Sequence, residues 1–156
     1  MAEIISDKKQ YLTFRLDEIY AFPVVRVMEV LELTKITRVP GSPEFMKGVI
    51  NSRGAVVPVV NLRKKISLEE KEITDDSRII ILDVVFNEEK SQLGVLVDEV
   101  MEVYSFAESD IEGKPAMGLN IKTDYISGVG KIRDLFVILL NIDTLFSLEE
   151  LSAAAV

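Results

Sequence analysis

Two apolar runs without alternating polar residues place the strongest constraint on the fold of this chain. Residues 56–60 read VVPVV and residues 79–82 read IIIL, and both runs are rich in β-branched side chains. A strand of this kind leaves neither face suited to water, so the sheets that contain it must curl on themselves or pack against each other. The sequence therefore predicts a mostly β protein, and two small barrels are the natural arrangement.

Further strands are expected wherever an apolar run lies between turn residues. Residues 11–16, YLTFRL, alternate between the two faces, and the run at 20–23 follows closely enough to form a hairpin with them. Pro58 has no amide hydrogen to donate, which predicts that it lies at a sheet edge or a bulge. The remaining expected strands are 48–51, 55–60, 78–86, 93–98, 100–106, 125–129 and 135–141.

Composition and charge narrow the class of partner. A chain of 156 residues that is 48% hydrophobic can bury a substantial core in one body or two small subdomains. The formal net charge of −8 repels phosphate groups, so we expect no nucleic-acid partner and no direct membrane binding. The chain has no cysteine, which excludes disulfides and thiolate metal sites. With no signal-peptide pattern at its acidic start, the sequence predicts a cytoplasmic location.

The absence of histidine argues against an enzyme and against a metal or cofactor site. Histidine is the commonest general base and the commonest metal ligand in proteins, and this chain has none. A small-ligand-binding or enzymatic barrel stays an alternative, in which carboxylates such as Asp98, Glu99 and Glu102 would line a pocket. The charged run at 69–76 is interpreted as a solvated linker.

Two short motifs occur twice in the same order. The tetrapeptide VMEV stands at 27–30 and again at 100–103, and each copy follows an apolar run. Later in each half an apolar strand ends in an asparagine, Asn61 or Asn141, suited to cap a short helical turn. The repeated order predicts two copies of one unit, the first at 10–66 and the second at 77–146. The capping box SLEE then predicts a C-terminal helix in the tail at 147–156.

The turn in the segment VINSRGAVVPVV contains a cation that the turn does not require. Asn51 can accept a backbone hydrogen bond, and Gly54 adopts positive φ without steric cost. Arg53 contributes nothing to that geometry. One interpretation is a solvated turn residue, and the other is a charge placed at the edge of a binding surface.

The whole pattern of motifs resembles the CheW-like family of bacterial chemotaxis coupling proteins. The resemblance runs from about residue 10 to residue 145, and its most specific part is KGVINSRGAVVPVVNLR. It implies two intertwined five-stranded SH3-like barrels with short helices. It also implies a non-catalytic adaptor without cofactors, which couples the cytoplasmic tips of chemoreceptors to the regulatory domain of the histidine kinase CheA. Such a protein would be cytoplasmic and recruited to membrane-associated receptor arrays, and a coupling protein of a non-flagellar chemosensory pathway is the alternative.

The resemblance also carries roles onto single residues. It implies receptor contacts for Val27, Glu29, Arg53 and Val100, and a kinase contact for Gly48. We expect Arg53 and Glu29 to lie close together, with the two valines on either side of a groove between the barrels. Plain core burial is the alternative for each valine. A bulge or tight corner within one barrel is the alternative for Gly48, because a strand glycine allows another backbone to approach closely.

Overall fold

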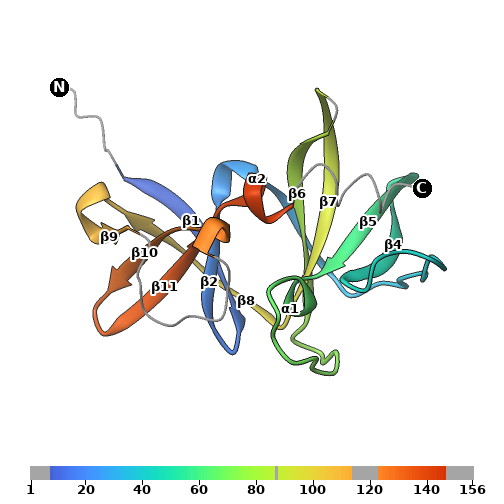
Figure 1. Ribbon diagram of the computed structural model, residues 1–156, viewed down its shortest axis with the longest axis horizontal. Helices are drawn as coiled ribbons and strands as arrows, with labels where there is room; N and C mark the ends of the chain where they lie inside the picture. Colours follow the sequence, from blue (N-terminus) through green and yellow to red (C-terminus); the bar gives the residue numbers. More distant parts are fainter. Residues whose placement is uncertain (1–7, 87, 114–122, 147–156) are drawn as a thin grey trace.

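The computed structural model describes residues 8–86, 88–113 and 123–146, which form two mixed β-sheets with a few short helices. Sheet I contains β8, β1, β2, β11, β10 and β9 in that order, and sheet II contains β3, β6, β7, β5 and β4. The two sheets lie side by side, with α1 and α2 near their junction (Figure 1). The strands are β1 (Lys9–Leu16), β2 (Glu18–Pro23), β3 (Val27–Glu32), β4 (Met46–Ser52), β5 (Ala55–Asn61), β6 (Arg78–Phe86), β7 (Glu89–Val97), β8 (Glu99–Phe106), β9 (Ile111–Glu112), β10 (Ile126–Ile132) and β11 (Leu135–Leu140).

Each sheet curls because the chain that leaves one edge strand returns to pair with the opposite edge. After β3 the chain crosses to β4, where Thr37 and Val49 exchange backbone hydrogen bonds of 2.8 Å in both directions. After β8 the chain forms β9, which pairs with β10 at the other edge of sheet I. This closure confirms the predicted mostly β, two-barrel architecture. The two-residue β9 gives sheet I a sixth strand where five were expected.

The two sequence repeats exchange hairpins. The range 10–66 supplies β1 and β2 to sheet I but β3, β4 and β5 to sheet II. The range 77–146 supplies β6 and β7 to sheet II and the remaining strands to sheet I. The exchanged hairpins join through equivalent parallel pairs, β2 with β11 and β7 with β5. Neither range therefore coincides with one sheet, and the two barrels are intertwined.

Three apolar clusters fill the part of the molecule that the structure describes. The central cluster includes Phe14 and Phe22 from sheet I together with Ile80 and Leu93 from sheet II, so it joins the two barrels. Each sheet also encloses a smaller cluster of its own. Sheet I encloses Tyr11, Ile19, Ala21, Phe106, Val137 and Leu139. Sheet II encloses Ile50, Val57, Val59, Ile79, Ile81 and Leu96. Since burying such a side chain contributes roughly 1.5–3 kcal/mol, the shared cluster strongly favours keeping the barrels together.

The short helices stand at equivalent places in the two repeats. The α-helix α1 (Leu62–Lys65) begins after Asn61, whose side chain accepts a hydrogen bond from the Lys64 amide. The α-helix α2 (Ile142–Leu145) begins after Asn141, whose side chain accepts hydrogen bonds from two amides of the first turn. Both asparagines therefore cap helical turns, as predicted. Three 3-10 turns, η1 (Val24–Arg26), η2 (Glu108–Asp110) and η3 (Thr123–Tyr125), complete these elements, and the predicted C-terminal helix at 147–156 lies outside the described residues.

Candidate functional site

The turn between β4 and β5 presents Arg53 to solvent. The Asn51 side chain accepts a hydrogen bond of 3.0 Å from the Gly54 amide, which closes the turn. Arg53 and Gly54 both have positive φ, 53° and 84°. An arginine in this conformation is less favoured than glycine or asparagine, so the backbone gives no reason for it. Its side chain is 85% exposed.

Arg53 forms an ion pair with Glu29 of β3. The Nη2 of Arg53 lies 3.4 Å from Oε2 of Glu29, whose side chain is 29% exposed. Glu29 comes within reach of Arg53 because sheet II curls until β3 approaches the tip of the β4–β5 hairpin. A shallow pocket at this point is lined by Met28, Glu29, Ser52, Arg53, Ala55 and Gln92. The expected proximity of Arg53 and Glu29 is therefore found in the structure.

Val27 and Val100 occupy equivalent positions at the border of the central cluster. Each is partly buried and packs against that cluster, Val27 from β3 and Val100 from β8. The ladders are irregular in both places, after Val27 in its pairing with β6 and beside Val100 in its pairing with β1. The structure therefore brings the two valines to one cluster from the two sheets, and part of each side chain stays accessible.

Gly48 is buried within sheet II. Its φ is 151°, and a Cβ atom placed there would overlap the carbonyl oxygen of Thr37 and meet the side chain of Ile36 at 2.9 Å. The backbone that approaches Gly48 is therefore the closing segment of its own barrel. The glycine is needed by the fold itself, which is the structural alternative that the sequence left open.

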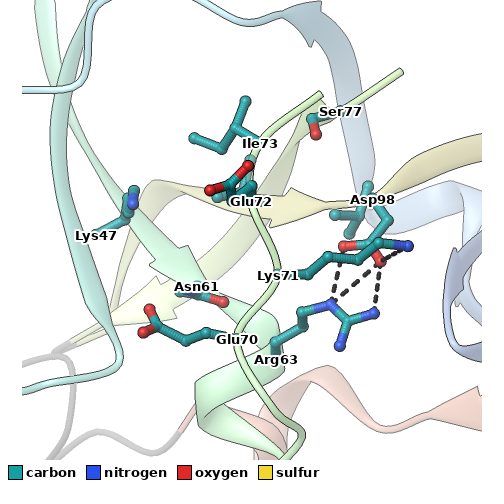
Figure 2. A pocket seen from close by; sticks show the side chains of 11 residues that line it. Lys47, Asn61, Arg63, Glu70, Lys71, Glu72, Ile73, Ser77 and Asp98 are labelled. Atoms are coloured by element: carbon teal, nitrogen blue, oxygen red, sulfur yellow. Dashed lines mark hydrogen bonds and ion pairs between the residues drawn. The ribbon is translucent and has the colours of Figure 1, made fainter. Parts of the chain in front are cut away.

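A buried arginine forms a second cluster of charges, which sequence analysis missed. The Arg63 side chain is 5% exposed, and its Nη2 lies 2.6 Å from Oδ1 of Asp17 and 2.6 Å from Oδ2 of Asp98. Its Nε donates to both oxygens of Asp98, at 3.0 and 3.1 Å, and its Nη1 donates to the carbonyl of Glu69 at 2.8 Å. Figure 2 shows Arg63 and Asp98 directed toward each other, and Lys71 Nζ lies 3.9 Å from Asp98.

These contacts stabilise the charged forms of the groups involved. Hydrogen bonding to Asp98, and then to Asp17, raises the pKa of Arg63 above its ordinary value although burial opposes the shift. The hydrogen bond from Arg63 lowers the pKa of Asp17. In the sequence, Arg63 begins the charged run RKK and looks like any solvated cation. Arg63 could have been identified only from the contact between α1 and the distant turn that contains Asp17, and no local sequence pattern shows that contact.

Carboxylates proposed for a small-ligand site do not converge. Asp98 does line a pocket together with Arg63, Asn61 and Lys71, but its charge is already balanced by Arg63. Glu99 instead lies 3.6 Å from Arg15. Within residues 8–86, 88–113 and 123–146, no group of three or more histidine, cysteine, aspartate or glutamate side chains could hold a metal ion. In the same part of the chain, no helix is long and apolar enough to cross a bilayer.

Comparison with known proteins shows to which family the chain belongs. The family described as CheW-like domain matches residues 10–150. The chain belongs to the CheW-like domain family. It is similar to "Chemotaxis protein CheW" of Bacillus subtilis, with 40% identity over 123 residues that cover 79% of this chain and 76% of that protein. The protein of the same name from Treponema pallidum is 29% identical over 147 residues, which cover 94% of this chain and 86% of that one.

A solved structure supports the same conclusion for the fold. The chain is similar to the crystal structure of scaffolding protein TtCheW from Thermoanaerobacter tengcongensis, with a TM-score of 0.80 and 34% identity. The match covers 91% of this chain and 94% of that one. As a CheW-like domain of this kind, the chain is a chemotaxis scaffolding protein and not an enzyme. The sequence-based assignment to this family is confirmed.

Proposed function

We propose that this CheW-like domain couples the cytoplasmic tips of chemoreceptors to the regulatory domain of the histidine kinase CheA. The observation that carries the proposal is the Arg53–Glu29 pair, in which a cation on a turn that does not require it is oriented by a carboxylate of the neighbouring strand. An adaptor that recognises helices needs placed charges for register and apolar area for affinity. The pair supplies the first of these.

Accessible apolar side chains on β3 and at the border of the central cluster supply the second requirement. Met28, which lines the same pocket as Arg53, is 52% exposed, and Val30 on the same strand is 40% exposed. Val27 and Val100 present their partly buried side chains at the border between the sheets. We therefore assign receptor contact to Val27, Glu29, Arg53 and Val100, with the arginine fork offered to a carboxylate or carbonyl on the receptor helices.

For the kinase, we place the contact on the face of sheet II that Gly48 supports. Gly48 is buried, so it would act by holding the Thr37 segment against β4 rather than by touching the kinase. Its neighbours Lys47 and Val49 are half-buried and keep part of their side chains accessible. Both partners would hold the protein at membrane-associated arrays on the cytoplasmic side. Its net charge of −8 disfavours direct contact with anionic lipid.

A pair of matched variants tests the proposal. Arg53→Glu removes the proposed receptor donor, whereas Arg133→Glu makes the same charge change in the β10–β11 turn, where the arginine has the same φ of 53°. The full-length protein is used to capture receptors and kinase from a bacterial extract. We expect Arg53→Glu to lose receptor and to keep kinase, while Arg133→Glu keeps both. Failure of the unsubstituted chain to recover either partner, or equal loss in both variants, contradicts the proposal.

A further inference from the structure

A single guanidinium connects parts of the chain that belong to different barrels. Arg63 lies on α1, which continues directly from β5 of sheet II. Its partner Asp17 forms the turn between β1 and β2 of sheet I, and its partner Asp98 is the one residue between β7 of sheet II and β8 of sheet I. Arg63 therefore ties sheet II both to the nearest turn of sheet I and to the crossover between the sheets.

The burial of Arg63 makes this connection specific. A guanidinium removed from water is tolerated only where its donors are satisfied, and leaving such a charge unpaired is strongly destabilising. Its acceptors come from Asp17, Asp98 and the Glu69 carbonyl, so they are complete only while the two sheets keep one relative orientation. An apolar interface alone would tolerate sliding, because the hydrophobic effect has no preferred direction.

The equivalent place in the second repeat carries the opposite arrangement of charge. Asp143 follows the capping Asn141 as Arg63 follows the capping Asn61. Asp143 accepts hydrogen bonds of 3.0 and 3.3 Å from Arg26, which lies in the other crossover between the sheets, from β2 to β3. Here the carboxylate is 73% exposed, so water screens the pair. One crossover is thus held by a buried network, and the other by an exposed ion pair together with one hydrogen bond of 3.0 Å from Nε of Arg26 to the Asp83 carbonyl.

We propose that Arg63 is a positioning residue that fixes the orientation of the two barrels, and that the Arg26–Asp143 side is the weaker of the two connections. Val27 directly follows Arg26, and Val100 lies two residues beyond Asp98, so the relative placement of the two valines depends on both crossovers. The expectation that Arg63 affects receptor binding rests on the proposed function. The expectation that Arg63 fixes the orientation of the barrels does not depend on it.

The orientation can be measured directly because the chain contains no cysteine. Cysteines introduced at Val85 of β6 and Val103 of β8, which are 61% and 49% exposed, allow one spin label on each sheet. Pulsed electron paramagnetic resonance then reports the distribution of distances between the barrels. We expect a single narrow distribution for the otherwise unsubstituted full-length chain.

Asp17→Asn is the decisive variant. Asp17 has a φ of 66°, a conformation that asparagine also tolerates, and its side chain is 55% exposed, so the substitution removes a charge without straining the turn. We expect a broadened distribution with additional distances, and the same result for Arg63→Met where that variant folds. Arg63→Lys, which keeps the charge but not the planar fork, should recover part of the narrow distribution.

Two control variants should change the distance distribution less than Asp17→Asn does, or not at all. Asp143→Asn breaks the exposed connection and should change the distribution less than Asp17→Asn does. Lys64→Met removes the neighbouring cation, whose Nζ lies 3.5 Å from Glu70, and should leave the distribution unchanged. A narrow, unshifted distribution in Asp17→Asn overturns the proposal, because a role limited to general stability would lower the melting temperature without changing the distance between the barrels.

A binding measurement separates this inference from the proposed function. Titration with a receptor-hairpin fragment should show a lower affinity for Asp17→Asn than for the unsubstituted chain, by up to about fivefold, which corresponds to about 1 kcal/mol. If the unsubstituted chain does not bind the fragment, the proposed function fails while the distance measurement still decides the role of Arg63. If distances broaden but the affinity is unchanged, the link from barrel orientation to receptor binding is wrong.

Discussion

Arg53 and Glu29 lie 24 positions apart in the sequence, and the curl of sheet II brings Nη2 of one to 3.4 Å from Oε2 of the other. The arginine is almost fully exposed while the carboxylate is mostly covered, so the pair holds a cation at the surface rather than burying it. An exposed ion pair of this length contributes little to stability, with a typical value of about 0–1 kcal/mol. The role that we propose for the pair is to orient the Arg53 donor.

Arg53→Glu should therefore separate binding from folding. The free energy of unfolding should change by no more than about 0.5 kcal/mol, as for ordinary surface substitutions. Affinity for a receptor-hairpin fragment should fall about tenfold or more, because the variant removes the donor and places a second carboxylate beside Glu29. Isothermal titration measures the affinity and urea denaturation the stability. Unchanged affinity would show that Arg53 is a solvated turn residue.

The double substitution Arg53→Glu with Glu29→Arg tests whether the two charges act chiefly on each other. If they do, the reversed pair can form again, and the double variant should recover part of the affinity that Arg53→Glu loses. If each charge meets its own group on the receptor, the double variant should bind more weakly than either single variant. The same titration, carried out on all four proteins as a cycle, distinguishes these results.

Gly48→Ala should destabilise the protein by about 2–4 kcal/mol, because the methyl group meets the Thr37 carbonyl in a backbone conformation that disfavours side chains. Gly54→Ala is the matched control, since Gly54 also has positive φ but no atom lies within 4 Å of a Cβ placed there. It should cost about 1 kcal/mol. Equal destabilisation of the two variants would show that the contact with Thr37 is unimportant. Kinase affinity measured on the folded fraction of Gly48→Ala then tests the proposed face.

Most strands could be predicted from the sequence because their cause is local. Apolar runs between turn residues gave 78–86 with its observed bounds, and the capping roles of Asn61 and Asn141 followed from side-chain chemistry. Such features depend on a few neighbouring residues, which the sequence displays directly. The prediction that Pro58 lies at a sheet edge or a bulge was wrong, because β5 is an inner strand of sheet II and Pro58 pairs regularly with Val49. Pairing of β5 with β7 begins only at the next residue, Val59.

Features that depend on the exchange of hairpins could not be predicted in this way. The β3 strand was recognised as part of a repeat but not as a strand, since its pairing with β6 is set by sheet II as a whole. Arg63 was missed for the same reason, because its acceptors Asp17 and Asp98 lie 46 and 35 positions away. The Arg53–Glu29 pair was expected from the family resemblance together with the predicted place of Arg53 at a hairpin tip. Periodicity reports which face is apolar, and it carries no information about which strand lies alongside.

Exchange of hairpins predicts how fragments of the chain behave. A fragment of residues 1–67 contains β1 and β2 without their partners β8 and β11, and a fragment of residues 75–156 contains β6 and β7 without β3 and β5. Each would expose strand edges and apolar surface, so neither should fold alone. Mixed together, they should restore both sheets. Amide dispersion in NMR spectra of each fragment and of the mixture measures this, and two separately dispersed fragments would contradict the exchanged topology.

The contact between Arg63 and Asp17 predicts how stability depends on pH. The hydrogen bond from Arg63 lowers the pKa of Asp17 below its ordinary value of 3.8, so the ionised carboxylate favours the folded state. For a lowered pKa the contribution is complete above about pH 5 and is lost as the pH falls below the ordinary value toward the folded one. Because the Asp17 side chain is 55% exposed, solvent screening should keep the contribution below about 1 kcal/mol.

Urea denaturation at a series of pH values should therefore show Asp17→Asn less stable than the unsubstituted chain near neutrality, with the difference shrinking in acid. Asp134→Asn, in the exposed β10–β11 turn, should show no such convergence, and a difference for Asp17→Asn that stays constant or grows in acid would show that Arg63 draws its stabilisation from Asp98 alone.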